Sequence, residues 1–200
     1  MTDRTNEPDE ELTSQLARSQ QARRERIMLA VLDLAAEGGY DAVQMRDVAD
    51  RAGVALGTLY NYYESRENLI YEAMIEWRRQ VATDSVTNVR GRTLEARLLS
   101  LLRHTFETYT DAPLLFETFT RMGVRPGEQD PRAHKIQVAA MDEVLAGTDP
   151  AWADDFRLIL GWVVYAGLSL AGQGQIPVEE VWPQIQRVVK RLVASQTDAR

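Results

Sequence analysis

Residues 44–66 read QMRDVADRAGVALGTLYNYYESR, and this stretch predicts two short helices joined by a tight turn. The first helix has apolar residues at the i, i+3, i+4 and i+7 spacing of one helix face, namely Met45, Val48, Ala49 and Ala52. Gly53 follows, and its lack of a side chain gives the backbone the freedom that a sharp corner needs. A second helix is expected at residues 56–62. The segment is therefore a helix-turn-helix motif.

The second helix of this motif has one inward side and one open side. Leu59 and Tyr63 are spaced to point toward the core. The opposite side is expected to face solvent and consists of Leu56, Gly57, Tyr60 and Asn61. In a helix-turn-helix the second helix enters the major groove of DNA with its N-terminal residues toward the base edges. The open side is therefore a candidate DNA-binding surface.

The candidate DNA contacts divide into three groups. The first group faces the bases and comprises Leu56, Gly57 and Tyr60, with Asn61 beside them. The second group is better placed for phosphate and comprises Thr58, Tyr62 and Arg66. The third group opens the first helix and comprises Gln44, Met45 and Arg46. We expect all of these residues to lie at the DNA-facing surface.

Each candidate also has a purely structural alternative. Tyr60 and Tyr62 are suited to packing on an amphipathic surface. Arg46 has Asp50 one helical turn away as an ion-pair partner, and the hydroxyl of Thr58 is suited to helix initiation. The motif as a whole indicates DNA binding more strongly than any single residue does, because the turn, the spacing and the tyrosines agree.

The composition is that of an ordinary soluble protein, with 200 residues, 44% hydrophobic residues and a formal net charge of -7. The negative total argues against non-specific nucleic-acid binding by the whole molecule, so the local distribution of charge decides. The absence of cysteine excludes disulfides and fits the cytoplasm, which is the expected location. The acidic N-terminus is unlike a secretion signal. The apolar stretch at residues 158–172 is shorter than the roughly 20 residues of a membrane span, so we expect a buried helix and no membrane partner.

The N-terminal segment reverses its charge along its length. Residues 1–14 are acidic and polar, which predicts disorder, and a disordered arm is expected over residues 1–20. Four arginines then accompany the single Glu25, namely Arg18, Arg23, Arg24 and Arg26. This basic stretch is either a phosphate-binding arm or the solvated start of a helix. The helix carries an apolar stripe from Ile27 onward and is stopped by the glycine pair at 38–39.

The rest of the chain predicts further helices and no strand. Ser65 is placed to cap the helix that follows it. Polar connections are expected at residues 83–93 and 123–132. The further helices are expected at residues 66–81, 94–109, 113–122, 136–147, 151–173 and 177–195. The predicted fold is all-α, with about nine helices, a three-helix N-terminal domain at residues 21–67 and a helical C-terminal domain at residues 68–200.

Five short stretches around the helix-turn-helix form a pattern, namely Val48-Ala49, Gly53-Val54, Gly57-Thr58-Leu59-Tyr60, Tyr62-Tyr63 and Ser65-Arg66-Glu67-x-Leu69. On these residues the segment resembles the N-terminal domain of the TetR family of transcriptional regulators. The chain departs from the family pattern at Gln44 and Ala55, where hydroxyl residues are usual, so the caps of both helices are expected to be weak. Arg66 stands where the family's usual lysine grips phosphate, and arginine preserves that charge.

The resemblance implies a regulator without enzymatic activity, cofactor or metal. It implies a homodimer, acting as a repressor, that binds a palindromic double-stranded DNA operator and leaves it when an effector binds. The residues expected to line the effector pocket are Phe106, Tyr109, Phe116, Phe119, Met122, Trp162 and Tyr165. The residues expected at the dimer interface are Trp152, Phe156, Leu160, Val163, Gly167, Trp182, Ile185 and Val189. The C-terminal domain is thus expected to bind the effector and to dimerise.

Within the family, residues 38–60 and 112–123 resemble the KstR-type actinobacterial repressors of sterol and lipid catabolism. This narrower resemblance implies a small hydrophobic or CoA-thioester effector. Two other classes of function are open. An enzyme is disfavoured because the only histidines, His104 and His134, lie on different predicted elements and form no metal-ligand spacing. A helical interaction module that has lost DNA binding fits the acidic net charge and the weak caps.

Overall fold

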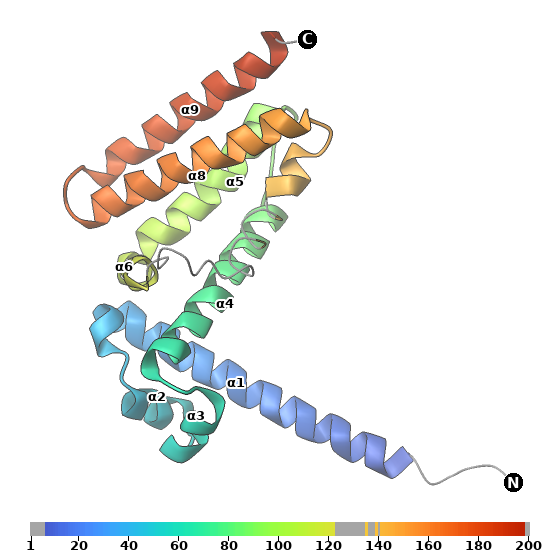
Figure 1. Ribbon diagram of the computed structural model, residues 1–200, viewed down its shortest axis with the longest axis vertical. Coiled ribbons are helices and arrows are strands. Elements are labelled where there is room, and N and C mark those ends of the chain that lie inside the picture. Colours follow the sequence, from blue (N-terminus) through green and yellow to red (C-terminus); the bar gives the residue numbers. More distant parts are fainter. Residues whose placement is uncertain (1–6, 123–134, 136–138, 140, 199–200) are drawn as a thin grey trace, which may run out of the picture. The chain divides into compact units, whose positions relative to one another are not determined.

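The computed structural model describes the backbone of residues 7–122, 135, 139 and 141–198, and the side chains of those between residues 14 and 196. The labelled helices are α1 (Glu7–Ala42), α2 (Met45–Ala52), α3 (Leu56–Tyr62), α4 (Arg66–Thr87), α5 (Leu94–Asp111), α6 (Pro113–Arg121), α8 (Pro150–Gly172) and α9 (Val178–Asp198) (Figure 1). No strand occurs in these described ranges, and the all-α prediction is confirmed. The chain divides into two compact units, Met1–Ala73 and Met74–Arg200, and the division falls within α4.

Helix α1 begins much earlier than the apolar pattern indicates, at Glu7. The prediction of a disordered arm over residues 1–20 is therefore wrong for residues 7–20. Composition supplies the reason, because Pro8 suits a first helical turn and the following residues are rich in strong helix formers such as Leu, Gln, Ala and Arg. The predicted stop is confirmed, since the helical dihedral angles are lost at glycines 38–39 and Gly39 has a φ of 69°.

The first unit has a small core formed by α1, α2, α3 and the start of α4. The apolar stripe of α2 is buried as predicted, and Leu59 and Tyr63 also point inward as predicted. Helix α1 adds Ile27, Ala30, Val31, Leu34 and Ala35 to this core, and α4 adds Leu69, Ile70 and Ala73. Each fully buried Leu, Ile or Val side chain stabilises the fold by about 1.5–3 kcal/mol. Packing of this kind holds two helices that are too short to be stable alone.

In the second unit, α5 packs against α6 and α9, and α8 packs against the same two helices. Two of its helices have side-chain caps, because Thr93 accepts from the N–H of Ala96 at the start of α5 and Asp149 accepts from the N–H of Trp152 at the start of α8. The predicted connection at residues 83–93 is shorter than expected, since α4 continues to Thr87. The predicted loop at residues 123–132 lies outside the described residues. Of the helix expected at residues 136–147, residues 136–138 and 140 also lie outside, whereas residues 139 and 141–145 are helical as predicted.

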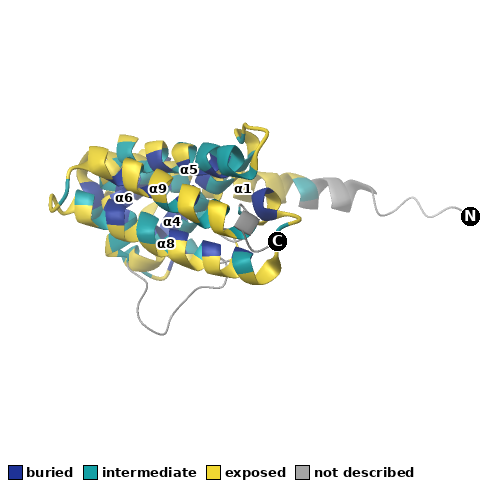
Figure 2. Cartoon of the chain, turned by 90° about the horizontal axis from the view of Figure 1, so that it is seen from above, coloured by how far each residue is buried: buried dark blue, intermediate teal, exposed yellow. Residues whose placement is uncertain are grey.

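Helix α8 is rich in apolar residues but buries only one of its sides. The buried side includes Phe156, Leu160 and Leu168. The other side carries exposed Leu158, Ile159, Trp162, Tyr165 and Leu170, which we call the outer stripe of α8. Figure 2 shows exposed and buried positions following one another along this helix. By length and composition alone, α8 is the one described helix that qualifies as a membrane span. The prediction of a buried helix at residues 158–172 is right for one side and wrong for the other.

Candidate functional site

Helix α3 presents the open side that the sequence pattern predicts. Leu59 is fully buried, whereas the side chains of Leu56 and Tyr60 are 40% and 52% exposed. Gly57 and Asn61 are also exposed. A Cβ atom placed on Gly57 would have no neighbour within 4 Å, so the backbone on this side is open to an approaching molecule. Large side chains that stay exposed on the second helix of a helix-turn-helix are in position to contact base edges and thymine methyl groups.

The two helices of the motif have no side-chain caps, so core packing and the turn between them hold them in place. Gly53 has a left-handed conformation, with φ 64° and ψ 43°. Its N–H donates to the carbonyl oxygens of Ala49 and Asp50 near the end of α2. Gln44 and Ala55, at the starts of α2 and α3, make no capping hydrogen bond, as the sequence predicts. The Nε2 of Gln44 donates instead to the carbonyl oxygen of Asp41 at 2.9 Å. By contrast, the predicted cap of α4 is present, since Ser65 Oγ accepts from its third residue.

Met45 is buried in the core, so its predicted contact with DNA is wrong. Its position belongs to the apolar stripe that faces α1, and the same periodicity that predicts the core excludes it from the surface. Gln44 and Arg46 on either side of it are exposed. Within the described residues, no ion pair joins Arg46 to Asp50, so the structural alternative for this arginine is not realised. Gln44 and Arg46 thus keep side chains that a DNA backbone can reach.

Arg66 also departs from its predicted role, because its guanidinium is directed into the fold. Its Nε donates to the carbonyl oxygen of Val43, and its Nη2 donates to the carbonyl oxygen of Tyr40. The Cζ atom lies 4.4 Å from the centroid of the Tyr40 ring. The expected phosphate contact therefore gives way to contacts with the end of α1 and the link to α2. Charge and position on a helix cannot reveal such contacts, because both carbonyls belong to a distant part of the sequence.

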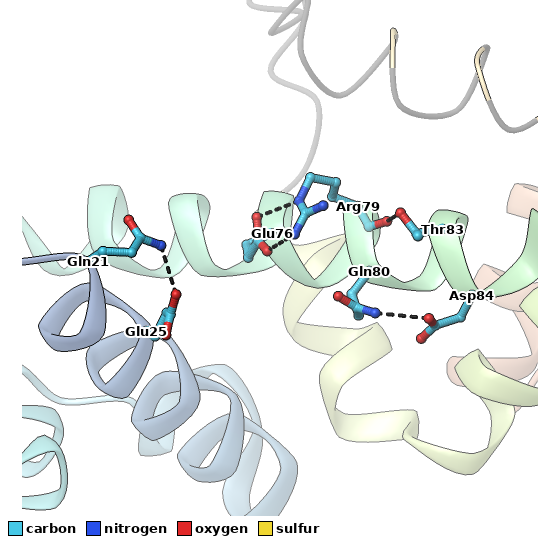
Figure 3. Close-up of polar contacts among 7 residues, drawn as sticks. All are labelled: Gln21, Glu25, Glu76, Arg79, Gln80, Thr83 and Asp84. Carbon is cyan, nitrogen blue, oxygen red and sulfur yellow. Dashed lines mark hydrogen bonds and ion pairs between the residues drawn. The ribbon is translucent and has the colours of Figure 1, made fainter. Parts of the chain in front are cut away.

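Basic side chains of α1 lie next to the recognition motif. The guanidinium of Arg24 stacks on the ring of Tyr62, with Cζ 5.5 Å from its centroid, and Arg18 is exposed farther along the helix. The only acid in this stretch, Glu25, accepts a hydrogen bond from Gln21 at 2.9 Å (Figure 3). Tyr62 is only partly exposed beneath Arg24, so it joins the end of α3 to a cationic surface. Sequence reasoning does not find this stacking.

Other polar pairs serve the helices and not a site. Arg26 donates to the carbonyl oxygen of Ala52 at 3.3 Å, which connects α1 to the end of α2. Figure 3 shows local pairs along α4, with Nε of Arg79 donating to Glu76 at 2.8 Å and Gln80 donating to Asp84 at 2.9 Å. Exposed pairs at this spacing stabilise a helix by only a few tenths of a kcal/mol, roughly 0.2–0.5. They indicate a solvated face of α4.

The aromatic residues expected around an effector are partly brought together. Ring centroids of Tyr109 and Phe116 are 5.0 Å apart, and those of Phe116 and Phe119 are 6.2 Å apart. Arg78 stacks on Phe119 at 4.9 Å. Burial raises the pKa of the Tyr109 phenol, and the charge of Arg78 opposes that shift. We call Tyr109, Phe116 and Phe119 the aromatic cluster. Met122 directly follows α6.

Three further residues expected at the pocket lie elsewhere. Phe106 packs on Trp182 of α9, with ring centroids 5.5 Å apart. Trp162 and Tyr165 belong to the outer stripe of α8 and are exposed, so their assignment to the pocket is wrong. The reason is that α8 is apolar on both sides, and periodicity alone does not tell which side faces inward.

The predicted dimer interface is also corrected. Phe156, Leu160, Gly167, Ile185 and Val189 are buried within a single chain, where they join α8 to α9, and are not available to a second copy. Trp152 and Trp182 are partly buried in the same unit and pack on Phe156 and Phe106, and Val163 is partly buried. The outer stripe of α8 is the exposed apolar surface of this helix.

The two histidines give no indication of an enzyme site. His104 lies within α5 and is partly buried, and its carbonyl oxygen accepts a hydrogen bond from Thr108 at 2.9 Å. His134 lies outside the described residues. Among the described side chains, no group of three or more His, Cys, Asp or Glu residues is placed to hold a metal ion.

Comparison with known proteins connects the motif to a family. Residues 27–73 match the family of bacterial regulatory proteins described as tetR family. The chain is 42% identical to the HTH-type transcriptional repressor KstR of Mycobacterium tuberculosis over 104 residues, which are 52% of this chain and 47% of that protein. The chain thus matches about half the length of this relative. An uncharacterized HTH-type transcriptional regulator of the same species is 29% identical over 203 residues, covering 98% of this chain and 91% of its own length.

The fold agrees with this sequence match. A crystal structure of a TetR transcriptional regulator from Rhodococcus sp. RHA1 superposes with a TM-score of 0.71 at 23% identity, covering 88% of this chain and 98% of that one. At this identity the similarity establishes the fold alone. The family match covers the helix-turn-helix whose geometry is described above, and the relatives that the chain resembles are described as transcriptional regulators. Residues 27–73 therefore form a helix-turn-helix domain of the tetR family of bacterial regulatory proteins, and the chain resembles the KstR-type transcriptional repressors in sequence.

Proposed function

We propose that this protein acts in the cytoplasm as a repressor of transcription that binds operator DNA through the open side of α3. The observation that carries the proposal is the exposure of Leu56, Gly57 and Tyr60 on a helix whose other side is locked by fully buried Leu59. The similarity to KstR repressors supports the direction of regulation. A rigid scaffold with exposed residues on its second helix is what insertion into a major groove requires.

In this proposal the DNA contacts have different roles. Leu56, Gly57, Tyr60 and Asn61 contact base edges, where apolar groups meet thymine methyls and Asn61 pairs with adenine. Phosphates are contacted by the exposed cations Arg18, Arg24 and Arg46. Polar groups contribute as well, namely Gln44 and Thr58 at the helix starts and Tyr62 at the end of α3. When arginines neutralise phosphates, the binding constant falls as the salt concentration rises. Each phosphate contact steepens the plot of the logarithm of the binding constant against the logarithm of the salt concentration by about 0.9. The acidic net charge is compatible with this because only the DNA-facing surface must be basic.

The proposed assembly is a homodimer joined through the outer stripe of α8. Its five members are exposed, although a soluble monomer seldom leaves such a continuous apolar surface open. A two-fold interface uses the same patch on both copies, so a stripe of this kind is self-complementary. Two recognition helices about one DNA turn apart, roughly 34 Å, then match a palindromic operator.

The effector in this proposal is a small hydrophobic molecule or a CoA thioester of an acyl or sterol-derived acid, held near the aromatic cluster. The aromatic rings offer apolar contact area, and Arg78 lies beside them. By linkage, an effector that prefers the conformation unable to bind operator must weaken operator binding. Native mass spectrometry with acyl and steroidal CoA thioesters tests this point. Retention of a free hydrophobic compound, with no thioester bound, would rule out the thioester.

Fluorescence anisotropy with DNA from upstream of the protein's own gene tests the DNA-binding proposal. We expect tight binding that weakens steeply as salt rises, and loss of that binding in the Tyr60→Ala variant. Leu29→Ala is the matched control, because Leu29 is an exposed apolar residue on α1 away from the core stripe. The competing function is a helical interaction module that has lost DNA binding. Absence of binding to that DNA and to genomic fragments at all salt concentrations would favour this module.

A further inference from the structure

Arg66 connects the two ends of the helix-turn-helix. We propose that it is a positioning residue, which holds the start of α2 against the start of α4, and that it does not bind DNA phosphate. The inference rests on the proposed DNA-binding function, because the helix that Arg66 positions is the one that meets DNA. It assigns a role that charge alone would not suggest for an arginine next to the recognition helix.

The guanidinium of Arg66 donates hydrogen bonds to two backbone carbonyl oxygens. Tyr40 is in the last turn of α1, and Val43 lies in the short link between α1 and α2. Both carbonyl oxygens accept from Arg66. Tyr40 follows the kink at glycines 38–39, and its carbonyl oxygen also accepts from the N–H of Val43 at 3.4 Å. Arg66 therefore donates to two carbonyls of the segment that leads from the kink into α2.

The remaining faces of the guanidinium are also occupied. Its plane lies over the Tyr40 ring at 4.4 Å, and Nη1 is 3.6 Å from Oε1 of Glu67. Only 19% of the side chain is exposed. A planar fork that donates to two carbonyls and stacks on a ring is specific to arginine, because lysine offers one compact ammonium group. Lysine at this position would keep the charge and lose the geometry.

The consequence concerns the orientation of α3. Helix α2 begins at Met45, two residues after Val43, and α3 ends at Tyr62, shortly before Arg66. Arg66, which follows α3, thus bonds to the segment that precedes α2 and connects the two ends of the motif. Neither helix has a side-chain cap of its own. Binding sites need supporting contacts that hold them to within about 0.5 Å of the productive geometry. Arg66 supplies such a contact.

The salt dependence of DNA binding separates positioning from phosphate contact. We expect Arg66→Lys and Arg66→Ala both to weaken operator binding by at least about tenfold, equivalent to one lost charge-assisted hydrogen bond, with an unchanged salt slope. Arg24→Ala is the matched control, because Arg24 is an exposed cation on α1 that stacks on Tyr62 at the end of α3, and its loss should reduce the slope by about one. Wild-type affinity in Arg66→Lys, together with a slope reduced by about one in Arg66→Ala, would overturn the inference.

Amide hydrogen exchange without DNA makes the inference testable apart from the proposed function. Arg66→Lys should speed exchange at Val43 and Val48, whose N–H groups bond to Tyr40 and Gln44 at the start of α2. Exchange at the core of the second unit should stay unchanged, which shows that the variant is folded. Unchanged exchange at the start of α2 would overturn the positioning role. If this exchange responds but the wild-type protein binds no DNA, the proposed function fails and the contact made by Arg66 stands.

Discussion

Replacement of Trp162 by alanine tests where two copies of the chain meet. The side chain of Trp162 is 66% exposed at the centre of the outer stripe of α8. A tryptophan presents on the order of 200 Å², so about 130 Å² is open, and its burial at about 25 cal/mol per Å² contributes about 3 kcal/mol. A two-fold interface contains this residue twice. The substitution therefore costs up to about 6 kcal/mol, or about 10⁴-fold in the dissociation constant of the dimer.

Sedimentation velocity over a range of protein concentrations measures this effect. We expect the wild type to sediment as a dimer and Trp162→Ala to dissociate at concentrations where the wild type does not. Leu29→Ala is the control, since Leu29 is 59% exposed on α1 and lies outside the stripe. Circular dichroism should show both variants folded, because neither residue belongs to a core. A dimer whose dissociation constant is unaffected by Trp162→Ala would refute the reasoning.

Three further predictions concern stability. Ala55→Ser supplies the missing cap of α3 and should raise the free energy of unfolding by about 0.5–2 kcal/mol in urea; a lower urea midpoint would contradict it. Gly167→Ala places a methyl group 2.7 Å from Cγ1 of buried Val181, and this overpacking should lower stability by about 1–3 kcal/mol in calorimetry, so an unchanged Tm would argue against it. Burial raises the pKa of Tyr109 above 10.0, so the folded state holds its proton more tightly and stability is lost as pH rises above that value. Tyr109→Phe should lessen this loss, and an identical pH profile would count against it.

The helix-turn-helix could be predicted from the sequence because its signals are local. The spacing of Val48 and Ala49 sets the core face of α2, and Gly53 sets the turn. Both predictions are confirmed, and the buried Leu59 leaves the opposite side of α3 open as expected. Even the absence of caps follows from residue type at Gln44 and Ala55. These features depend on neighbours within a few residues.

Features that depend on distant partners could not be predicted. Arg66 looks like a phosphate ligand until the carbonyls of Tyr40 and Val43 are brought to it by the fold. Helix α8 is apolar on both sides, so only the positions of α6 and α9 decide that Phe156 is inside and Trp162 outside. The N-terminal part of α1 lacks an apolar stripe. Its acidic composition predicts disorder, although the helix propensity of its residues favours the helix that forms.

The central claim is that the open side of α3 reads DNA sequence. Selection of DNA from a random pool, performed in parallel with the wild type and with a Leu56→Ala, Tyr60→Ala double variant, tests it most directly. We predict that the wild type enriches an inverted repeat whose half-sites lie about one helical turn or a multiple of it apart, and that the double variant loses or alters that preference. No enriched sequence with the wild type, or the same sequence enriched equally by both proteins, would contradict the claim.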